Sequence, residues 1–474
     1  MTRAVTALLL VAAFLASPGV ASAKPVPPQA VAALIDTGIN PYAPAFRDHS
    51  ALAYKHPSTY IPGFPKDVPA LRITLDKPYA VALKKDAALW ESVADNELYW
   101  IPGTRVIGAI TMGPGGTHCP GVVQIPIVAD EIPGPCTERK ILDDHGHGTM
   151  TASRAAGYPH SLAPDARIVE IEGLGAQGLL WEAKQGWIDV SSNSWSSLVP
   201  HPVEGQLPES VFGPSVTASA KYIASRVLTL FASGNGAGGV AGATPTNTYM
   251  EATMPPGIVS VGGHDNGRIT AWAGIPAHVV ADDYGGFRAP KDSERAMSPD
   301  PIACCTSAAT PYAAGGAAAI VLEARRILGD HRTGIHNGVV ARGRRGIVKS
   351  GPLSDGVFTM DELKTVFFHS AEQLPREGRD DGLLHWSGDP RAPDYVEMGP
   401  GANPFCVLCT TMPIRWTDVP PGVDPFPFVG YGAINERSAA LAARVLSGRT
   451  PVPQRSSDDA QYAQDQMLRV LLYP

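Results

Sequence analysis

The sequence predicts an α/β fold, in which a mostly parallel sheet is flanked by helices. Short apolar runs rich in Val, Ile and Ala alternate with helix-like stretches up to about residue 330, which is the pattern of a parallel sheet covered by helices. No repeat at a fixed period is visible, and this excludes solenoids and propellers. The 474 residues, 44% of them hydrophobic, are enough to bury a large core. Four apolar runs are the predicted strands: Ala30–Ile35, Arg167–Ile171, Val227–Ala232 and Gly257–Gly262.

The first 23 residues have the features of a secretory signal peptide. Arg3 supplies a positive start, an apolar stretch runs from Ala4 to Leu15, and Ala21-Ser22-Ala23 is a small-residue cleavage site. An anchor helix is disfavoured because the apolar stretch is far shorter than the roughly 20 residues that span a membrane. We therefore expect a secreted protein that starts at Lys24 and has no integral membrane segment.

Residues 47–140 are predicted to be a large insertion in a domain that covers 24–446. This stretch holds many prolines and several aromatic residues, and it lacks the alternation of the predicted sheet. After it, a small-residue helix is expected from Met150 to Gly157, and an Ala-rich helix from Tyr312 to Arg325. Pro311 is expected in the first turn of the second helix, where proline is tolerated.

Two amphipathic helices are predicted near the end of the domain. Phe358–Glu372 has Thr359 as a candidate cap before two acidic residues, and its apolar residues follow at helical spacing. Tyr431–Leu446 is the second. Residues 447–474 begin with glycine and prolines and are interpreted as a C-terminal tail that ends in a short helix over 458–472.

The charge of the chain excludes one class of partner, and its cysteine content indicates disulfides. The net charge of -7 is spread over a chain with 18% charged residues and no long run of Lys or Arg, so nucleic acid is not an expected partner. Six cysteines in an exported chain are compatible with disulfides. Cys119 and Cys136 are the most natural pair, and closing their loop stabilises by roughly 3 kcal/mol. The pairing of the others stays open: Cys304, Cys305, Cys406 and Cys409.

Two segments supply a candidate acid and base. Asp36 follows the first strand and precedes Thr37-Gly38, which suits an orienting carboxylate but also fits an Asx turn. His147 lies at the start of a small-residue helix, within a segment that begins Asp143-Asp144-His145. The competing interpretation of that segment is metal ligation by His145 and His147 with the two aspartates.

Two later segments supply a candidate oxyanion donor and nucleophile. Asn235 lies between glycines directly after a strongly apolar strand, where it can donate a side-chain N–H or simply form a turn. Ser307 lies at or near the start of the Ala-rich helix, where the helix dipole favours negative charge; its alternative role is an N-cap. Together the four segments place acid, base, oxyanion donor and nucleophile in the chain order Asp, His, Asn, Ser. The order Asp, His, Ser distinguishes subtilisin-type triads from those of other serine hydrolases.

Three motifs resemble the signatures of the subtilisin-like serine protease family, the subtilases. They are Asp36-Thr37-Gly38, Gly146-His147-Gly148-Thr149 and Thr306-Ser307-Ala308-Ala309-Thr310-Pro311. The resemblance extends to Ala163-Pro164-Asp165-Ala166, Asn193-Ser194-Trp195, Gly234-Asn235 and Gly430-Tyr431-Gly432. It implies a serine endopeptidase with Asp36, His147 and Ser307 as its triad and Asn235 as oxyanion donor. It also implies that an extended polypeptide substrate lies along Ser194, Trp195, Ser196 and Gly234.

The resemblance implies no cofactor for catalysis, although structural calcium is common in the family. Asp282-Asp283 and Asp380-Asp381 offer suitable oxygen ligands. Three positions depart from the family pattern, namely Cys305, Ser196 and Met150, and only Lys24 to Ala30 separate the cleavage site from the first strand, which leaves no room for an inhibitory pro-domain. Cys305, Ser196 and the long insertion leave a catalytically silent binding or scaffold protein as an alternative. His145 with His147 leaves a metal-dependent hydrolase as another.

Overall fold

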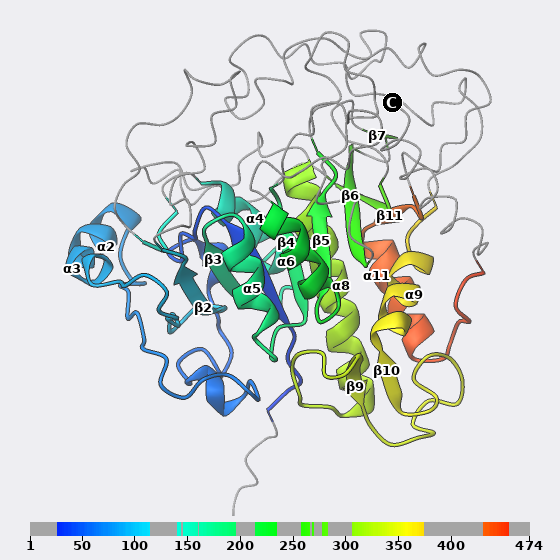
Figure 1. Cartoon of the computed structure of the whole chain (residues 1–474). Coiled ribbons are helices and arrows are strands. Elements are labelled where there is room, and N and C mark those ends of the chain that lie inside the picture. Colours follow the sequence, from blue (N-terminus) through cyan, green and yellow to red (C-terminus); the bar gives the residue numbers. More distant parts are fainter. Residues whose placement is uncertain are drawn as a thin grey trace, which may run out of the picture.

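The computed structural model describes residues 26–113, 140–143, 146–159, 161–195, 214–234, 257–265, 268–269, 277–282, 306–373 and 430–454. A sheet with strand order β11-β8-β6-β5-β4-β1-β3-β2 forms its centre (Figure 1). All pairings along this order are parallel, and β7 adds an antiparallel pairing to β6. The strands are β1 (Val31–Asp36), β2 (Val106–Thr111), β3 (Arg167–Glu172), β4 (Val190–Asn193), β5 (Leu228–Ala232), β6 (Ile258–Asp265), β7 (Arg268–Ile269), β8 (Val279–Asp282) and β11 (Ala433–Ile434).

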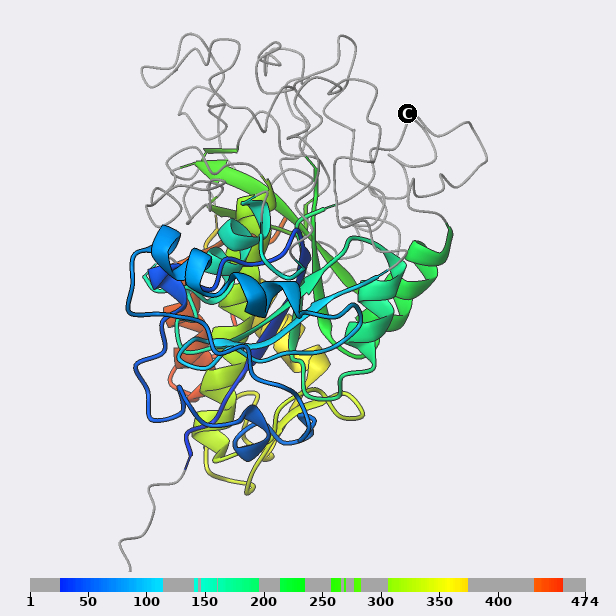
Figure 2. The same ribbon diagram turned by 90° about the vertical axis from the view of Figure 1, so that its left-hand side faces the viewer.

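Helices cover both faces of the sheet, which confirms the predicted α/β class. One face carries α4 (His147–Ala156) and α8 (Thr306–Leu328), with α9 (Met360–His369) and α11 (Glu436–Leu446) packed beside α8. The other face carries α5 (Ala176–Ala183) and α6 (Pro214–Ala224), which lie together at the right in Figure 2.

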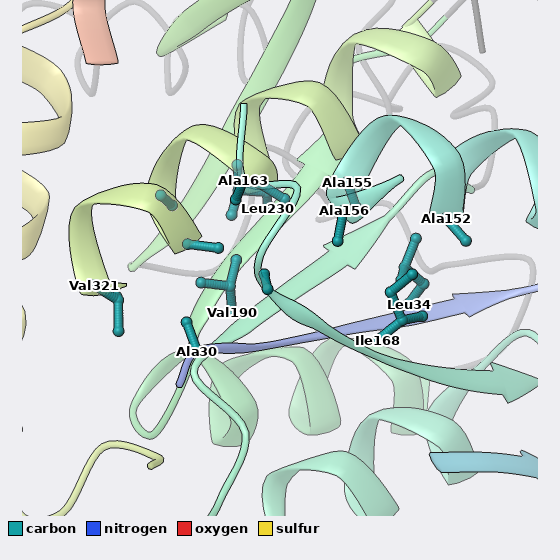
Figure 3. Close-up of a cluster of buried hydrophobic side chains, with 14 of the residues drawn as sticks. Ala30, Leu34, Ala152, Ala155, Ala156, Ala163, Ile168, Val190, Leu230 and Val321 are labelled. Atoms are coloured by element: carbon teal, nitrogen blue, oxygen red, sulfur yellow. The ribbon is translucent and has the colours of Figure 1, made fainter. Parts of the chain in front are cut away.

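Alternate residues of β1 enter two different cores. Val31, Ala33 and Ile35 belong to the core under α5 and α6, whereas Leu34 belongs to the core under α4 and α8 (Figure 3). This is the two-sided burial expected of a central parallel strand. Where α4 and α8 meet, the second core is lined mainly by alanines, so these two helices approach each other closely.

The crossing of α4 and α8 depends on one glycine. A Cβ atom added at Gly315 of α8 would lie 2.6 Å from the carbonyl oxygen of Ala155 in α4, which is closer than non-bonded atoms approach. Only glycine therefore permits this backbone separation. Close packing of the two helices brings their N-terminal ends to the same edge of the sheet, where β1 also ends (Figure 1).

The four predicted strands are confirmed as β1, β3, β5 and β6. Three of them start one residue later than predicted, β3 starts as predicted, and β6 continues three residues further, to Asp265. The structure differs from the prediction inside residues 47–140, because residues 106–111 form β2 and pair with β3 at the edge of the sheet. This part of the range therefore belongs to the sheet rather than to an insertion outside it. The remainder up to residue 113 forms short elements: η2 (Pro57–Thr59), α2 (Tyr79–Lys85) and α3 (Ala87–Glu91), with η1 (Pro44–Phe46) just before it.

A buried hydrogen-bond network attaches this segment to the core. The Tyr42 hydroxyl donates to Asp86 at 2.8 Å and accepts from the Trp90 indole at 2.9 Å. Asp86 also accepts from the backbone N–H and hydroxyl of Thr74. Burial raises the pKa of the Tyr42 hydroxyl far above its ordinary value, so it remains a neutral donor.

The C-terminal helices follow the prediction at one end and depart from it at the other. Thr359 caps α9 through a reciprocal capping box with Glu362, as predicted. The second helix begins at Glu436 rather than Tyr431, because Asn435 caps it and the preceding residues form β11. In the predicted tail, Pro453 reaches the end of α9, where His369 Nδ1 is 2.9 Å from the Pro453 carbonyl oxygen. The helix expected over 458–472 lies outside the described residues.

Hydrophobic helices of membrane-spanning length do not occur among the residues that the structure describes. The predicted signal peptide, residues 1–23, lies outside them.

Candidate active site

Asp36 is the last residue of β1 and is held in one orientation by three donors. It is almost fully buried, and its Oδ1 accepts hydrogen bonds from the Thr37 backbone N–H at 2.8 Å and from His147 Nδ1 at 2.7 Å. Its Oδ2 accepts from the Thr151 hydroxyl at 3.0 Å. An ionised carboxylate accepts hydrogen bonds only, so His147 carries its proton on Nδ1 and directs Nε2 away from Asp36.

His147 is the first residue of α4, and the turn after β1 is docked on that helix end. The Gly148 backbone N–H donates to the Thr37 hydroxyl at 2.8 Å. A Cβ atom at Gly148 would lie 2.1 Å from the Gly38 carbonyl oxygen, so only glycine permits the turn to approach this closely. The side chain of His147 is 21% exposed against 3% for Asp36, and the imidazole therefore lies between the buried acid and the surface.

Asp143 caps α4 and anchors the same turn. Its Oδ1 accepts from Gly146 N–H at 2.7 Å and from the Thr37 hydroxyl at 2.9 Å. Its Oδ2 accepts from the backbone N–H and the hydroxyl of Thr149. Burial raises the pKa of the Asp143 carboxyl, and the hydrogen bonds from Thr149 and its other donors oppose that rise.

Ser307 is the second residue of α8, and it exchanges two hydrogen bonds with Ser194 beyond the end of β4. The Ser307 hydroxyl donates to the Ser194 carbonyl oxygen at 3.2 Å, and the Ser194 hydroxyl donates to the Ser307 carbonyl oxygen at 2.9 Å. The Ser307 carbonyl needs this external donor because the residue four positions later is Pro311, which has no N–H. The expectation that Pro311 lies in the first turn is wrong, since α8 begins at Thr306 and Pro311 is inside the helix.

The starts of α4 and α8 lie next to each other. Met150, one turn after His147, packs against Ala308, which follows Ser307, and the two form a buried pair. The Arg154 side chain of α4 reaches the Ala308 carbonyl oxygen at 3.4 Å. The arrangement therefore gathers a buried carboxylate, an imidazole bonded to it and a serine at a helix N-terminus along one edge of a parallel sheet.

A family model described as the Subtilase family of peptidases, S8, matches residues 29–299 of this chain, which is more than half of it. The chain belongs to the subtilase family. It is a serine-type endopeptidase with a polypeptide substrate. The matched range contains Asp36 and His147 and ends before Ser307, so Ser307 rests on its motif and on its place in α8.

Two solved serine proteases resemble the subtilase at low sequence identity. The epidermin leader peptide processing serine protease EpiP from Staphylococcus aureus is 12% identical with a TM-score of 0.41, and the match covers 92% of this chain and 77% of EpiP. A mutant of the protease domain of PatA is 12% identical with a TM-score of 0.39, and the match covers 90% of this chain and 99% of that domain. No curated protein sequence matches the chain.

The described residues of the predicted substrate edge follow neighbouring strands. Ser194 and Trp195 follow β4, and Gly234 follows β5, which pairs with β4. Gly234 has φ of 114°, a conformation that favours glycine. Trp195 as a whole is 6% exposed, and its ring packs edge-on against Phe231 of β5 at 5.4 Å, so the indole is enclosed against the sheet.

Several predicted residues lie outside the part of the chain that the structure describes. These are Asn235, Ser196, His145 and all six cysteines, including the predicted Cys119–Cys136 pair. Among the described residues, no group of three His, Cys, Asp or Glu is placed to hold a metal ion. The interpretation of Asp143 as a metal ligand is not favoured by its hydrogen bonds, because four donors already occupy its two oxygens.

One of the calcium candidates is paired with a cation. Asp282 lies 3.4 Å from the Arg154 guanidinium through Oδ2, and its carbonyl oxygen accepts from the same guanidinium at 2.6 Å. Asp283 and Asp380-Asp381 lie outside the described residues. The Arg154 charge works against a calcium ion at Asp282.

Sequence reasoning missed three groups that surround Asp36, namely Thr151, Asp143 as a cap, and Glu170. Glu170 of β3 is fully buried, and burial, followed by the nearby Asp36, Asp143 and Glu172, raises the pKa of its carboxyl well above the ordinary value. Burial and the neighbouring carboxylates thus disfavour a second negative charge behind Asp36. Only the Asp143 cap had a sequence signal, an acid just before a helix start; the other two contacts arise from packing of α4 on the sheet.

Proposed function

We propose that this subtilase is a secreted endopeptidase that cleaves peptide bonds through an Asp36, His147 and Ser307 triad, with Asn235 as an oxyanion donor. The observation that carries the proposal is the 2.7 Å hydrogen bond between Asp36 Oδ1 and His147 Nδ1 at the head of α4. It selects the imidazole tautomer whose Nε2 accepts a proton, which is the requirement for a general base.

In the proposed reaction, His147 Nε2 removes the hydroxyl proton of Ser307 as Oγ attacks the carbonyl carbon of the scissile bond. Asp36 stabilises the imidazolium that forms. His147 then gives the proton to the leaving amine, and an acyl-enzyme on Ser307 remains. Water, deprotonated by the same imidazole, attacks the acyl group and releases the acid product and the free Ser307.

The negative charge of the tetrahedral intermediate requires donors that are already in place. The proposal assigns this task to the Asn235 side chain, just beyond the end of β5, and to the N-terminal end of α8, where the helix dipole favours negative charge. Substrate would lie as an added strand along Ser194, Trp195, Ser196 and Gly234. The positive φ of Gly234 and the burial of the Trp195 ring support an approach by substrate backbone.

The test compares hydrolysis of a fluorescein-labelled denatured protein by purified enzyme and by Ser307→Ala. We expect a loss of about 10⁴-fold or more in Ser307→Ala and in His147→Ala, because the members of a triad act as a unit. Asn235→Ala is expected to lose about 10²-fold to 10³-fold in kcat. Ser225→Ala, which changes an exposed serine after α6, is the matched control and should keep full activity.

A serine-directed phosphonate gives an independent readout. Mass spectrometry should show one phosphonate adduct per enzyme molecule, on the peptide that contains Ser307. Ser307→Ala should carry no adduct. Equal hydrolysis by the enzyme and by Ser307→Ala would contradict the assigned nucleophile. Loss of hydrolysis on chelation, with labelling unchanged, would favour the metal-dependent alternative.

We also propose export with cleavage after Ala23, and catalysis that needs no cofactor. The apolar stretch from Ala4 to Leu15 and the small residues before Lys24 support the first part. Expression in a secreting host should give a protein in the medium whose N-terminal residue is Lys24. Intact mass with residues 1–23 still attached would contradict this processing.

A further inference from the structure

An open cavity of about 850 Å³ lies at the N-terminal edge of the sheet. Its lining includes residues 26–29 before β1, residues 48–52, the start of β3 and the second half of α8. Asp36 lies at the other end of β1, and a six-residue strand is roughly 20 Å long. The cavity is therefore separate from the candidate active site.

Two guanidinium groups in this cavity lie near one buried carboxylate, and one of them pairs with it. The Arg167 side chain, 5% exposed, pairs with Asp48 and donates to the Gln29 side chain at 2.8 Å. Arg105, 14% exposed on its side chain, is close enough to Arg167 and Asp48 to interact with both electrostatically. Two cations with little solvent exposure, Arg105 and Arg167, therefore lie near one buried anion, Asp48.

Asp165, the other acid near Arg105, does little to neutralise the charge of the guanidinium group. Asp165 is 3.8 Å from the Arg105 guanidinium and its side chain is 90% exposed, so water screens this pair and it contributes little. Burial lowers the pKa of Arg105, and the nearby Arg167 lowers it further, against the opposite effects of Asp48 and Asp165. An incoming anion would relieve this uncompensated charge.

The remaining walls of the cavity combine an apolar stretch with charged groups, namely Lys55 and the Glu323–Arg326 ion pair. Leu52, Ala163, Ala319 and Leu322 line it beside the prolines that precede β1. Such a surface next to a guanidinium group suits a ligand with an anionic end and an apolar body. Among planar anions, a carboxylate matches the paired N–H groups of arginine.

We propose that this cavity is a binding site for an amphiphilic organic carboxylate, of the kind found at the C-terminal end of a peptide with an apolar last residue, and that Arg105 binds the carboxylate. The carboxylate takes the side of Arg105 that faces the cavity, and the apolar body lies against Leu52 and Leu322. The site is distant from the proposed triad and does not depend on it.

The test is a calorimetric titration of the full-length enzyme with three probes at constant ionic strength. N-acetyl-leucine should bind saturably. N-acetyl-leucinamide, which has the same shape without the charge, and inorganic phosphate, which has charge without the apolar body, should each bind at least about tenfold more weakly. Equal binding of N-acetyl-leucine and its amide, equal binding of phosphate, or no binding of N-acetyl-leucine would each overturn the proposal.

Variants locate the site. Arg105→Gln should weaken N-acetyl-leucine binding about tenfold or more, since a charge-assisted hydrogen bond is lost. Asp165→Asn, at an exposed position, should tighten it several-fold, because the acid that competes for Arg105 is neutralised. Arg437→Gln, which removes an exposed arginine paired with Glu372, should leave it unchanged. Unchanged binding in both Arg105→Gln and Asp165→Asn would place the ligand elsewhere, the active site included, and would also overturn the proposal.

Discussion

At the scale of single residues, the orientation of Asp36 depends on more than its contact with His147. Thr37 and Thr151 occupy the remaining acceptor positions with hydrogen bonds of 2.8 and 3.0 Å. The Thr151 hydroxyl lies equally near the Gly148 carbonyl oxygen, at 3.0 Å, but an ionised carboxylate is the stronger acceptor. Thr151 is therefore a positioning residue that acts on His147 through Asp36.

Thr151→Val should lower kcat by roughly tenfold, since the variant keeps the shape of the side chain and removes one charge-assisted hydrogen bond. KM should change little, because the change reaches the substrate only through the proposed triad. Steady-state kinetics on a short peptide substrate measures both constants. Thr151→Ser restores the hydroxyl and should recover most of the rate; a loss that Thr151→Ser does not recover would assign Thr151 a packing role instead.

Glu182 in α5 shows what burial does to a carboxyl group away from the proposed triad. It is fully buried, its Oε2 accepts from the Ser191 hydroxyl at 2.8 Å, and burial raises the pKa of its carboxyl from 4.5 to about 8. The folded protein therefore holds a proton that the unfolded chain releases above about pH 4.5. Stability is lost as pH rises from about 4.5 to about 8, and the penalty is complete above that range.

Glu182→Gln should remove this pH dependence, because glutamine keeps the acceptor and does not ionise. Its melting temperature should match that of the unchanged enzyme near pH 4.5 and exceed it by about 2 °C or more near pH 8. Differential scanning calorimetry across this range gives the result. A difference between the two proteins that stays constant with pH would show that Glu182 does not change its charge there.

At the scale of elements, the strands that sequence patterns predict are those with apolar residues on both faces. β1, β3, β5 and β6 satisfy this rule. The pattern fails for β4, whose residues after Val190 are serines and asparagine, although all four of its residues are buried. The Ser191 hydroxyl donates to Glu182 and accepts from the Asn193 side-chain amide, and such pairing leaves no trace in hydrophobic periodicity.

The sequence pattern did not predict β2 either, for a different reason. Its Gly108 falls inside the strand and ordinarily weakens a strand assignment. A Cβ atom at this position would lie 3.2 Å from Leu98 and from Val169 of β3. The glycine is thus explained by close packing across the edge of the sheet, which a single sequence does not reveal.

α8 carries a defect that Ser194 corrects. Pro311 removes the N–H that would bond the Ser307 carbonyl oxygen, and the Ser194 hydroxyl supplies the missing donor at 2.9 Å. Ser194→Ala should therefore lower the free energy of unfolding by about 1–3 kcal/mol, the cost of an unsatisfied buried carbonyl. In a Pro311→Ala background the helix regains its own donor, and the cost should be about 1 kcal/mol smaller.

A double-mutant cycle in denaturant measures this coupling. Equal costs of Ser194→Ala in both backgrounds would show that the Ser307 carbonyl does not depend on Pro311. The matched control is Ser92→Ala, which changes an exposed serine hydrogen-bonded to Leu89 and should have the same small effect in both backgrounds.

At the scale of the whole molecule, the two ends of the sheet have different tasks. The C-terminal edge carries Asp36, His147 and Ser307, and the N-terminal edge carries a buried ion pair that joins distant parts of the chain. Arg325 of α8 and Asp189 before β4 are both fully buried, with guanidinium-to-carboxylate distances of 2.8 and 2.6 Å. Asp189 also accepts from the backbone N–H groups of Val31 and Gly334.

The chemistry at the C-terminal edge was the more predictable of the two. Asp36 and His147 lie in short motifs. One motif directly follows a predicted strand, and the other lies at the predicted start of a helix. Arg325 and Asp189 are 136 positions apart, and each stands in an ordinary local setting. Only the crossing of α8 under the sheet brings them together, so pattern reasoning on one sequence has nothing from which to infer the pair.

Asp189→Ala should destabilise the enzyme by about 3–5 kcal/mol, because it leaves the Arg325 charge buried without a partner and removes the acceptor of two backbone N–H groups. Arg437→Gln breaks the pair between Glu372 and the Arg437 side chain, which is 82% exposed, and this loss should cost no more than about 1 kcal/mol. Thermal unfolding of both variants measures the difference. Asp189 lies at the opposite end of the sheet from the proposed triad, so the folded fraction of Asp189→Ala should retain the original kcat at low temperature. Activity that falls in proportion to the unfolded fraction would confirm a structural role, whereas a reduced kcat in fully folded Asp189→Ala would show that the two edges of the sheet are coupled.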